Sequence, residues 1–285
     1  MTTFCDAHNH LQDKRLELYL PDLMPAMHAA GITKCVVNGT CQEDWPRVIK
    51  LAHRYPDLIL PSLGLHPWHI ATRSRDWVEN LKQFLAGETY PVFIGECGLD
   101  RSARGSDFEA QKEIFTIHLA LASKQDLPLS IHCVRAWGAL LEILRTNDIP
   151  KRGFLLHSYG GSPELVTELV PLGAYFSFSG PFLINNRPRA REIFQRIPPD
   201  RLLAETDAPD MCPPEEYREH QLEGPGDTPL NHPANLPQVI RGMAEILDHE
   251  EQPLRSLLLN NFSTFFQVKP RTKKTLRFKK PLDLR

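Results

Sequence analysis

Hydrophobic and polar positions along the chain alternate between two patterns. Short apolar runs of strand length, mostly bounded by Gly or Pro, are followed by stretches with the period of an amphipathic helix. The apolar runs predict eight strands, at Thr3–His8, Lys34–Asn38, Ile59–Leu65, Val92–Glu96, Leu129–His132, Phe154–His157, Ala174–Phe178 and Arg201–Thr206. The stretches between them predict helices, at Leu20–Ala30, Glu43–Arg54, Asp76–Ala86, Phe108–Lys124, Trp137–Arg145, Pro163–Pro171 and Arg189–Arg196.

Eight strand–helix units in succession determine the predicted fold class. They favour an α/β fold, a (β/α)8 barrel of the TIM type, with an open doubly wound sheet as the alternative. A Pro/Gly-rich loop follows at Ala208–Pro233, and helical sequence then runs from Leu236 to about Phe265. We therefore expect one barrel domain over residues 1–267, followed by a short basic segment, 268–285.

The composition excludes several classes of protein. The chain has 285 residues, 41% of them hydrophobic and 24% charged, as expected for a globular protein with a sizeable core. No apolar run approaches the ~20 residues of a membrane span, and the N-terminus lacks the pattern of a signal peptide. Six cysteines without a CxxC spacing indicate reduced thiols, and hence a cytoplasmic protein.

The charge is distributed unevenly. The formal net charge is −2, but Lys269–Arg285 holds eight basic residues and one acidic residue, so it carries +7 and the preceding 268 residues carry −9. An acidic body does not resemble a protein that binds nucleic acid over its whole surface. The basic segment alone could contact a polyanion.

Residues that can bind metals recur where the predicted strands end. In a barrel of this type the active site lies at the C-terminal ends of the strands. The first strand ends in a His-x-His pair, whose period of two directs both imidazoles to the same side. Together, the ends of five strands provide four imidazoles and two carboxylates, from His8, His10, Glu96, His132, His157 and Asp207.

Six such residues exceed the needs of one catalytic ion, which usually takes three protein ligands and a water. They suit two divalent ions ~3.5–4 Å apart that hold a hydroxide between them. Imidazoles favour zinc, and carboxylates also accept manganese or magnesium. Glu96, flanked by Gly95 and Gly98, is expected to bridge the ions. Asp207 is expected to hold one ion and to accept the proton of the attacking water.

Other polar residues are predicted near this site. Asp6 and Glu205 share side-chain parity with the ligands two positions further on, so they either orient ligand histidines or form buried hydrogen bonds to the backbone. His66 ends the third strand and is expected to contact substrate. Arg135 could clamp a phosphate or carboxylate, or form a surface salt bridge.

Aromatic residues are also predicted in the loops at the mouth of the barrel. There they could stack on bases, and each could equally pack within its loop. They are Trp68, His69, Tyr159, Phe182 and Tyr217.

The motifs, taken in order, identify a family. Over about residues 1–266 the chain resembles the TatD family of metal-dependent deoxyribonucleases, which belongs to the amidohydrolase-like barrels. The motifs that carry the resemblance are Asp6-Ala7-His8-Asn9-His10-Leu11, Gly64-Leu65-His66-Pro67, Gly95-Glu96-Cys97-Gly98-Leu99-Asp100, Ile131-His132-Cys133-Val134-Arg135-Ala136, His157-Ser158-Tyr159-Gly160-Gly161, Glu205-Thr206-Asp207-Ala208-Pro209 and Asn260-Asn261-Phe262.

The resemblance implies a TIM-type barrel that binds divalent metals through the six residues above and hydrolyses phosphodiester bonds. It also implies that Glu96 bridges the metals and that His66 and Arg135 lie near the substrate. Gln12 departs from the family pattern, which commonly has an acidic residue after the His-Leu of the first motif. We expect this departure at the rim of the site.

The leading hypothesis is thus a divalent-metal-dependent phosphodiesterase, a (deoxy)ribonuclease acting as an exonuclease on single-stranded DNA or short nucleic acid. An alternative keeps the metals and changes the bond, giving an amide, ester or aminoacyl-tRNA hydrolase on the same barrel. A third hypothesis, a non-catalytic nucleic-acid-binding protein, is disfavoured by the intact set of ligands.

Overall fold

Eight parallel strands form one sheet whose order in space follows their order in the chain. The computed structural model describes residues 3–88, 90–103, 107–184, 187–224, 226 and 228–267, so the basic segment 268–285 lies outside the described residues. The strands are β1 (Phe4–Asn9), β2 (Ile32–Gly39), β3 (Ile59–Leu63), β4 (Phe93–Asp100), β5 (Leu129–Val134), β6 (Phe154–Leu156), β7 (Ala174–Phe178) and β8 (Leu202–Ala204).

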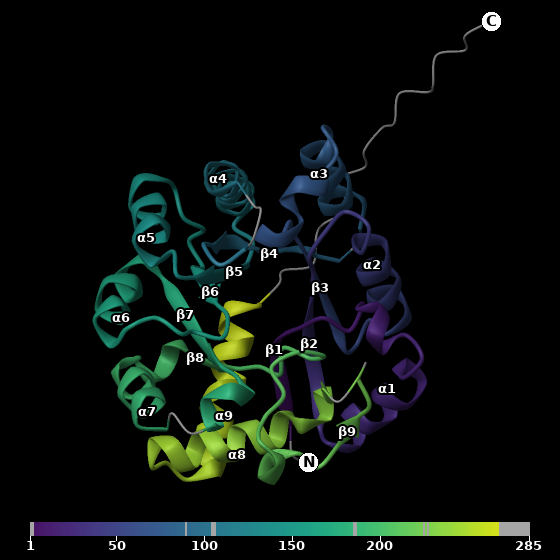
Figure 1. Cartoon of the computed structure of the whole chain (residues 1–285), viewed down its shortest axis with the longest axis vertical. Helices are drawn as coiled ribbons and strands as arrows, with labels where there is room; N and C mark the ends of the chain where they lie inside the picture. Colours follow the sequence, from purple (N-terminus) through teal and green to yellow (C-terminus); the bar gives the residue numbers. More distant parts are fainter. Residues whose placement is uncertain are drawn as a thin grey trace, which may run out of the picture.

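Helices alternate with the strands and surround them in a ring (Figure 1). They are α1 (Leu20–Ala29), α2 (Trp45–Arg54), α3 (Trp77–Gly87), α4 (Phe108–Gln125), α5 (Trp137–Thr146), α6 (Pro163–Leu169), α7 (Arg187–Arg196), α8 (Leu236–Leu247) and α9 (Glu251–Phe265). This arrangement confirms the predicted (β/α)8 barrel.

The barrel closes between its first and last strands through side chains and loops. Among the described residues no ladder pair joins β1 to β8. Instead, Asp207 N donates to His8 O at 2.9 Å, and His10 N donates to Ala208 O at 2.7 Å. The Asp6 carboxylate accepts hydrogen bonds from the backbone N and the hydroxyl of Thr206. The seam therefore fixes the two segments that carry three of the predicted metal ligands.

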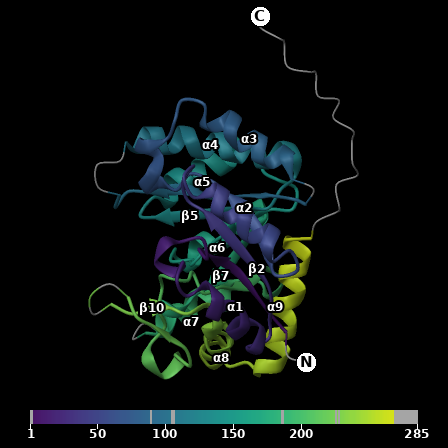
Figure 2. The ribbon, with the colours of Figure 1, turned by 90° about the vertical axis from the view of Figure 1, so that its right-hand side faces the viewer.

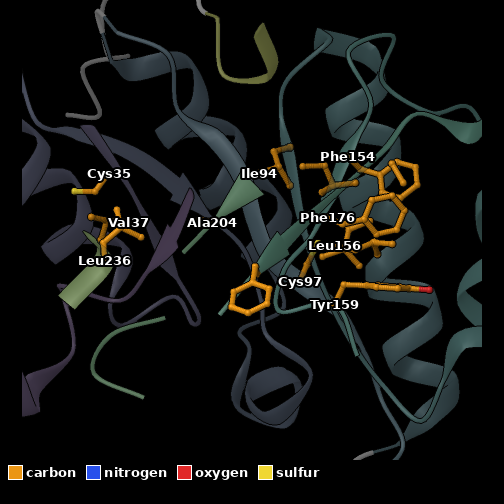
Figure 3. Close-up of a cluster of buried hydrophobic side chains, with 14 of the residues drawn as sticks. Cys35, Val37, Ile94, Cys97, Phe154, Leu156, Tyr159, Phe176, Ala204 and Leu236 are labelled. Carbon is orange, nitrogen blue, oxygen red and sulfur yellow. The ribbon is translucent and has the colours of Figure 1, made fainter. Parts of the chain in front are cut away.

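Apolar side chains fill one end of the barrel and the layer between the strands and the helices. Phe154, Leu156 and Phe176 lie together between the strands and the outer helices (Figure 3). At one end, Phe262 and Phe265 of α9 join a second buried cluster with residues from six strands. Figure 2 shows α9 at this end and the small hairpin of β9 (Gln221–Leu222) and β10 (Leu230–Asn231) at the opposite end.

The fourth strand differs most from the sequence prediction. It was expected to end at Glu96, but β4 continues to Asp100. Its pairing with β5 shifts register between Ile94 and Cys97. The two backbones then come so close at Gly98 that a Cβ there would lie 2.0 Å from His132 O. Because the strands stay paired beyond the shift, Glu96 lies in the middle of β4.

Two expectations from composition concerned membrane-spanning helices and the state of the cysteines. In the part of the chain that the structure describes, no helix combines the length and apolarity needed to cross a bilayer. All six cysteines are free thiols.

A buried histidine outside the strand ends positions the loop after β3. His118 of α4 donates from Nδ1 to Ile114 O at 2.8 Å, and its Nε2 accepts the backbone N–H of Leu65 at 3.2 Å. Burial disfavours the charged imidazole and lowers the pKa of His118 to about 4. The unfolded chain binds this proton near pH 6.5. Stability is therefore lost as the pH falls from about 6.5 towards 4.

We expect His118→Gln to reduce this acid sensitivity, because the amide can both accept and donate but does not titrate. At pH 7.5 the variant should be less stable than the wild type, and by pH 5 this difference should shrink by about 2 kcal/mol. Urea unfolding in the presence of a chelator at both pH values measures it. His28→Gln, at an exposed position of α1, is the matched control. A difference that is the same at both pH values would contradict the assignment.

Candidate metal centre

The Glu96 carboxylate lies between two pairs of imidazoles. Its Oε2 is 3.4 Å from His8 Nε2 and 3.3 Å from His10 Nε2. Its Oε1 is 3.1 Å from His132 Nδ1 and 2.8 Å from His157 Nε2. Each oxygen of one buried carboxylate therefore faces a different pair of ring nitrogens.

Within each pair the ring nitrogens are close together. His8 Nε2 and His10 Nε2 are 3.3 Å apart, and His132 Nδ1 and His157 Nε2 are 3.2 Å apart. Asp207 joins the first pair, with its Oδ1 3.2 Å from His10 Nε2 and 3.6 Å from His8 Nε2. The six predicted ligands thus come together at one end of the barrel.

The outer ring nitrogens face groups that orient the imidazoles. His10 Nδ1 lies 2.7 Å from the carbonyl oxygen of Asn38, which can only accept, so the proton is on Nδ1 and Nε2 keeps a lone pair. His8 Nδ1 lies 2.8 Å from the hydroxyl of Ser130. Each inner nitrogen of this pair is thereby directed at Glu96.

The second pair is oriented by carboxylates. His132 Nε2 lies 3.4 Å from Asp100 Oδ2, and His157 Nδ1 lies 3.4 Å from Glu205 Oε1. Both outer nitrogens are therefore the protonated ones in the neutral rings, which leaves lone pairs on the two inner nitrogens. Lone pairs 3.2 Å apart repel each other unless a cation lies between them. Two nitrogens on one tetrahedral zinc ion, at ~2.0–2.1 Å, are about 3.3 Å apart.

Buried acceptors also fit a cation. Glu96 Oε1 and Asp207 Oδ1 are buried and accept no hydrogen bond from the residues that the structure describes. A buried acceptor without a partner is costly, and a metal ion would compensate it. The residues present therefore fit a divalent metal. Three overlapping groups have the necessary spacing: His8 with Glu96 and His157, His8 with His10 and Asp207, and His66 with Glu96 and His132.

The electrostatics of the site favour positive charge between the two carboxylates. Burial alone would raise the pKa of Glu96, but the surrounding imidazoles outweigh it and hold the pKa well below its usual range. Burial alone would lower the pKa of His10, but Asp207 and Glu96 outweigh it and raise the pKa well above its usual range. A proton or a metal ion can supply this positive charge.

Comparisons with known proteins identify the family of this chain. The model of the TatD related DNase family matches residues 5–267. The chain belongs to this family. The metal-dependent hydrolase YabD of Bacillus subtilis is 28% identical over 92% of this chain and 98% of its own length. The metal-dependent hydrolase YjjV of Escherichia coli is 32% identical over 84% of this chain and 88% of its own length.

A nuclease and a solved structure are also similar to this chain. The 3'-5' ssDNA/RNA exonuclease TatD of Erwinia tasmaniensis is 34% identical over 75% of this chain and 81% of its own length. The crystal structure of YjjV superposes with a TM-score of 0.83 at 28% identity, covering 93% of this chain and 98% of that chain. This TatD family member is therefore a metal-dependent hydrolase.

His66 also lies beside the metal centre, but its hydrogen bonds place the proton of the neutral ring on the nitrogen that faces Glu96. Its Nε2 is 3.4 Å from Glu96 Oε1. Its Nδ1 accepts the backbone N–H of Trp68 at 3.2 Å, so the neutral ring carries its proton on Nε2. Burial lowers the pKa of His66 to about 4, against the opposing effect of Glu96. A neutral ring with an inward-facing N–H suits hydrogen-bond donation, whereas its spacing to Glu96 and His132 also fits a metal ligand.

Arg135 lies at the surface of the protein. It directly follows β5, has a positive φ of 52° and is exposed. It makes no hydrogen bond or ion pair with any residue that the structure describes. The alternative of a surface salt bridge is thus not observed among these residues.

The two carboxylates predicted behind the ligands have different roles. Glu205 faces the ring of His157, as described above, whereas Asp6 accepts from the backbone of His8 and Thr206. Both alternatives weighed from the sequence are therefore observed, one for each residue.

The expectation for Gln12 was wrong, because its side chain is buried rather than at the rim. Its amide donates to the same Asn38 carbonyl that orients His10.

Sequence reasoning identified Glu205 but missed two other residues that face the rings, Asp100 and Ser130. Asp100 lies at the end of β4, and the underestimated length of that strand hid it. Ser130 lies two positions before His132 on the same face of β5, and this period of two is the signal that could have identified it.

Proposed function

We propose that this chain is a two-metal phosphodiesterase that removes nucleotides from single-stranded DNA or short nucleic acid. The observation that carries the proposal is the position of Glu96, with one carboxylate oxygen towards each pair of imidazoles. A carboxylate in this position suits a bridge between two ions. The name of the Erwinia relative, a 3'-5' ssDNA/RNA exonuclease, supports the nucleic-acid substrate and the direction of cleavage.

Six residues would hold the ions. His8, His10 and Asp207 would hold one, His132 and His157 would hold the other, and Glu96 would contact both. Imidazoles and carboxylates in this mixture suit zinc or manganese, and magnesium less well. Bound there, the ions would lower the pKa of a water molecule and polarise a phosphoryl oxygen.

The remaining steps belong to side chains of this protein. The Asp207 carboxylate would accept the proton that the attacking water loses. The N–H of His66 at Nε2 would donate to a non-bridging phosphate oxygen. Arg135 would bind a neighbouring phosphate through its guanidinium, which matches the geometry of that group.

Two further expectations are part of this proposal. The match of the family model over residues 5–267 supports a single catalytic domain over residues 1–267, with 268–285 as an appended basic segment. Six free thiols support a cytoplasmic location.

The direct test compares substrates on the metal-reconstituted wild type. Single strands labelled at the 3′ or at the 5′ end should be shortened from the 3′ end, while a panel of carboxylic esters and amides should react slowly. Rapid turnover of the esters without cleavage of the strands would replace this proposal with the ester or amide hydrolase.

We expect His10→Ala to lower the metal content from two ions per chain to about one, because it removes a ligand from one ion only. His66→Ala should retain both ions, because its inward nitrogen carries a proton. Elemental analysis after reconstitution and gel filtration measures both. Equal loss of metal in the two variants would make His66 a ligand.

Replacement of Asp207 by Asn should lower kcat by ~10²–10⁴-fold, because an amide cannot take up the proton of the attacking water. The variant should stay folded, which circular dichroism checks. If it keeps more than a tenth of the wild-type activity, the base is another group.

A further inference from the structure

Of the five aromatic residues predicted at the mouth of the barrel, three are used for packing. Tyr159 is buried and donates its hydroxyl to Ser162 O. Tyr217 is buried, and Phe182 packs against Phe178 and Phe194. Trp68 differs, because 63% of its surface is exposed. Its exposed indole therefore contributes little burial to folding.

Trp68 is nevertheless held in place by two hydrogen bonds. Its indole Nε1 donates to Asp100 Oδ2 at 2.7 Å, and its backbone N donates to His66 Nδ1 at 3.2 Å. Asp100 is itself fixed by the backbone N and the hydroxyl of Ser102, at 2.7 and 2.6 Å. An exposed aromatic ring anchored in this way loses little conformational entropy when it binds a partner.

The ring lies next to the metal centre. Its centroid is 4.9 Å from that of His66, nearly perpendicular at 83°, and 6.4 Å from that of His132. A phosphodiester held at the centre carries a nucleoside on each side. One of its bases would come within reach of an indole at this distance.

We propose that Trp68 is a stacking platform for the base of a nucleotide next to the scissile phosphate. This inference rests on the proposed function and specifies how that site selects nucleic acid over other phosphodiesters. Stacking on an aromatic face tolerates any base, so it selects for the presence of a base and not for sequence. The hydrogen bond to Asp100 makes the platform rigid and links its position to the group that orients His132.

The test combines variants with substrates that lack one base. The substrate is a hexamer of deoxyadenosine, and in each of a series of analogues one nucleotide is abasic. On the intact hexamer, Trp68→Ala should raise KM about tenfold. On the analogue that lacks the stacked base, the KM of the wild type should rise by the same factor. The KM of Trp68→Ala should be the same on this analogue as on the intact hexamer. Trp68→Phe, which keeps an aromatic face, should stay within about threefold of the wild type.

Two controls separate stacking from structural damage. Leu18→Ala removes another large exposed apolar side chain, at 89% exposure, and should leave KM unchanged. The metal content of Trp68→Ala should equal that of the wild type. A rise in KM that is equal for the intact hexamer and for every abasic analogue would overturn the proposal. So would a Trp68→Phe variant as impaired as Trp68→Ala.

Fluorescence provides a readout that does not need catalysis. The other three tryptophans, Trp45, Trp77 and Trp137, are buried or half-buried. In a chelator, the intact hexamer should therefore quench mainly Trp68, and the analogue without the stacked base should not. If the wild type cleaves no strand, the proposed function fails. Quenching by the hexamer in the wild type but not in Trp68→Phe would still support the platform, and its absence would refute it.

Discussion

The site depends on one buried carboxylate whose two oxygens face two different pairs of imidazoles. Glu96 brings a negative charge into the end of a barrel, where an unpaired ion would be strongly destabilising. Imidazoles on both sides compensate for that charge, and three strands besides β4 provide or precede those rings: β1, β5 and β6. Glu96 lies within the register shift of β4, between Ile94 and Cys97, and the strand continues beyond it to Asp100.

The histidines work as ligands because something else holds their far nitrogens. A backbone carbonyl, a hydroxyl and two carboxylates each face one ring. The carbonyl and the carboxylates can only accept, so in the neutral rings of His10, His132 and His157 the proton points away from Glu96. This arrangement concentrates lone pairs and negative charge in a small volume. Without a cation, these lone pairs and carboxylates repel one another. The same repulsion makes the site bind a divalent cation in preference to a neutral ligand.

The sequence predicted the fold and the six converging residues because both follow from simple periods. Alternation of apolar strands and amphipathic helices leads to a barrel, and residues at equivalent strand ends must meet at one rim. The prediction that Glu96 ends its strand was wrong, because β4 continues to Asp100 beyond a register shift that interrupts its pairing with β5. The position of Gln12 was also predicted wrongly. Its hydrogen-bond partner is the backbone carbonyl of Asn38 on another strand, and the pattern of side chains in a sequence does not reveal a backbone partner.

The closure of the barrel explains why residues near both ends of the chain share the site. His10 and Asp207 are almost 200 positions apart, yet they lie on either side of a seam joined by main-chain hydrogen bonds and by Asp6. Asp6 accepts hydrogen bonds from the backbone of His8 and of Thr206, so it joins the two sides of the seam. A disturbance of this seam would separate Asp207 from the imidazoles of β1. The metal centre is therefore formed by the same contacts that complete the fold.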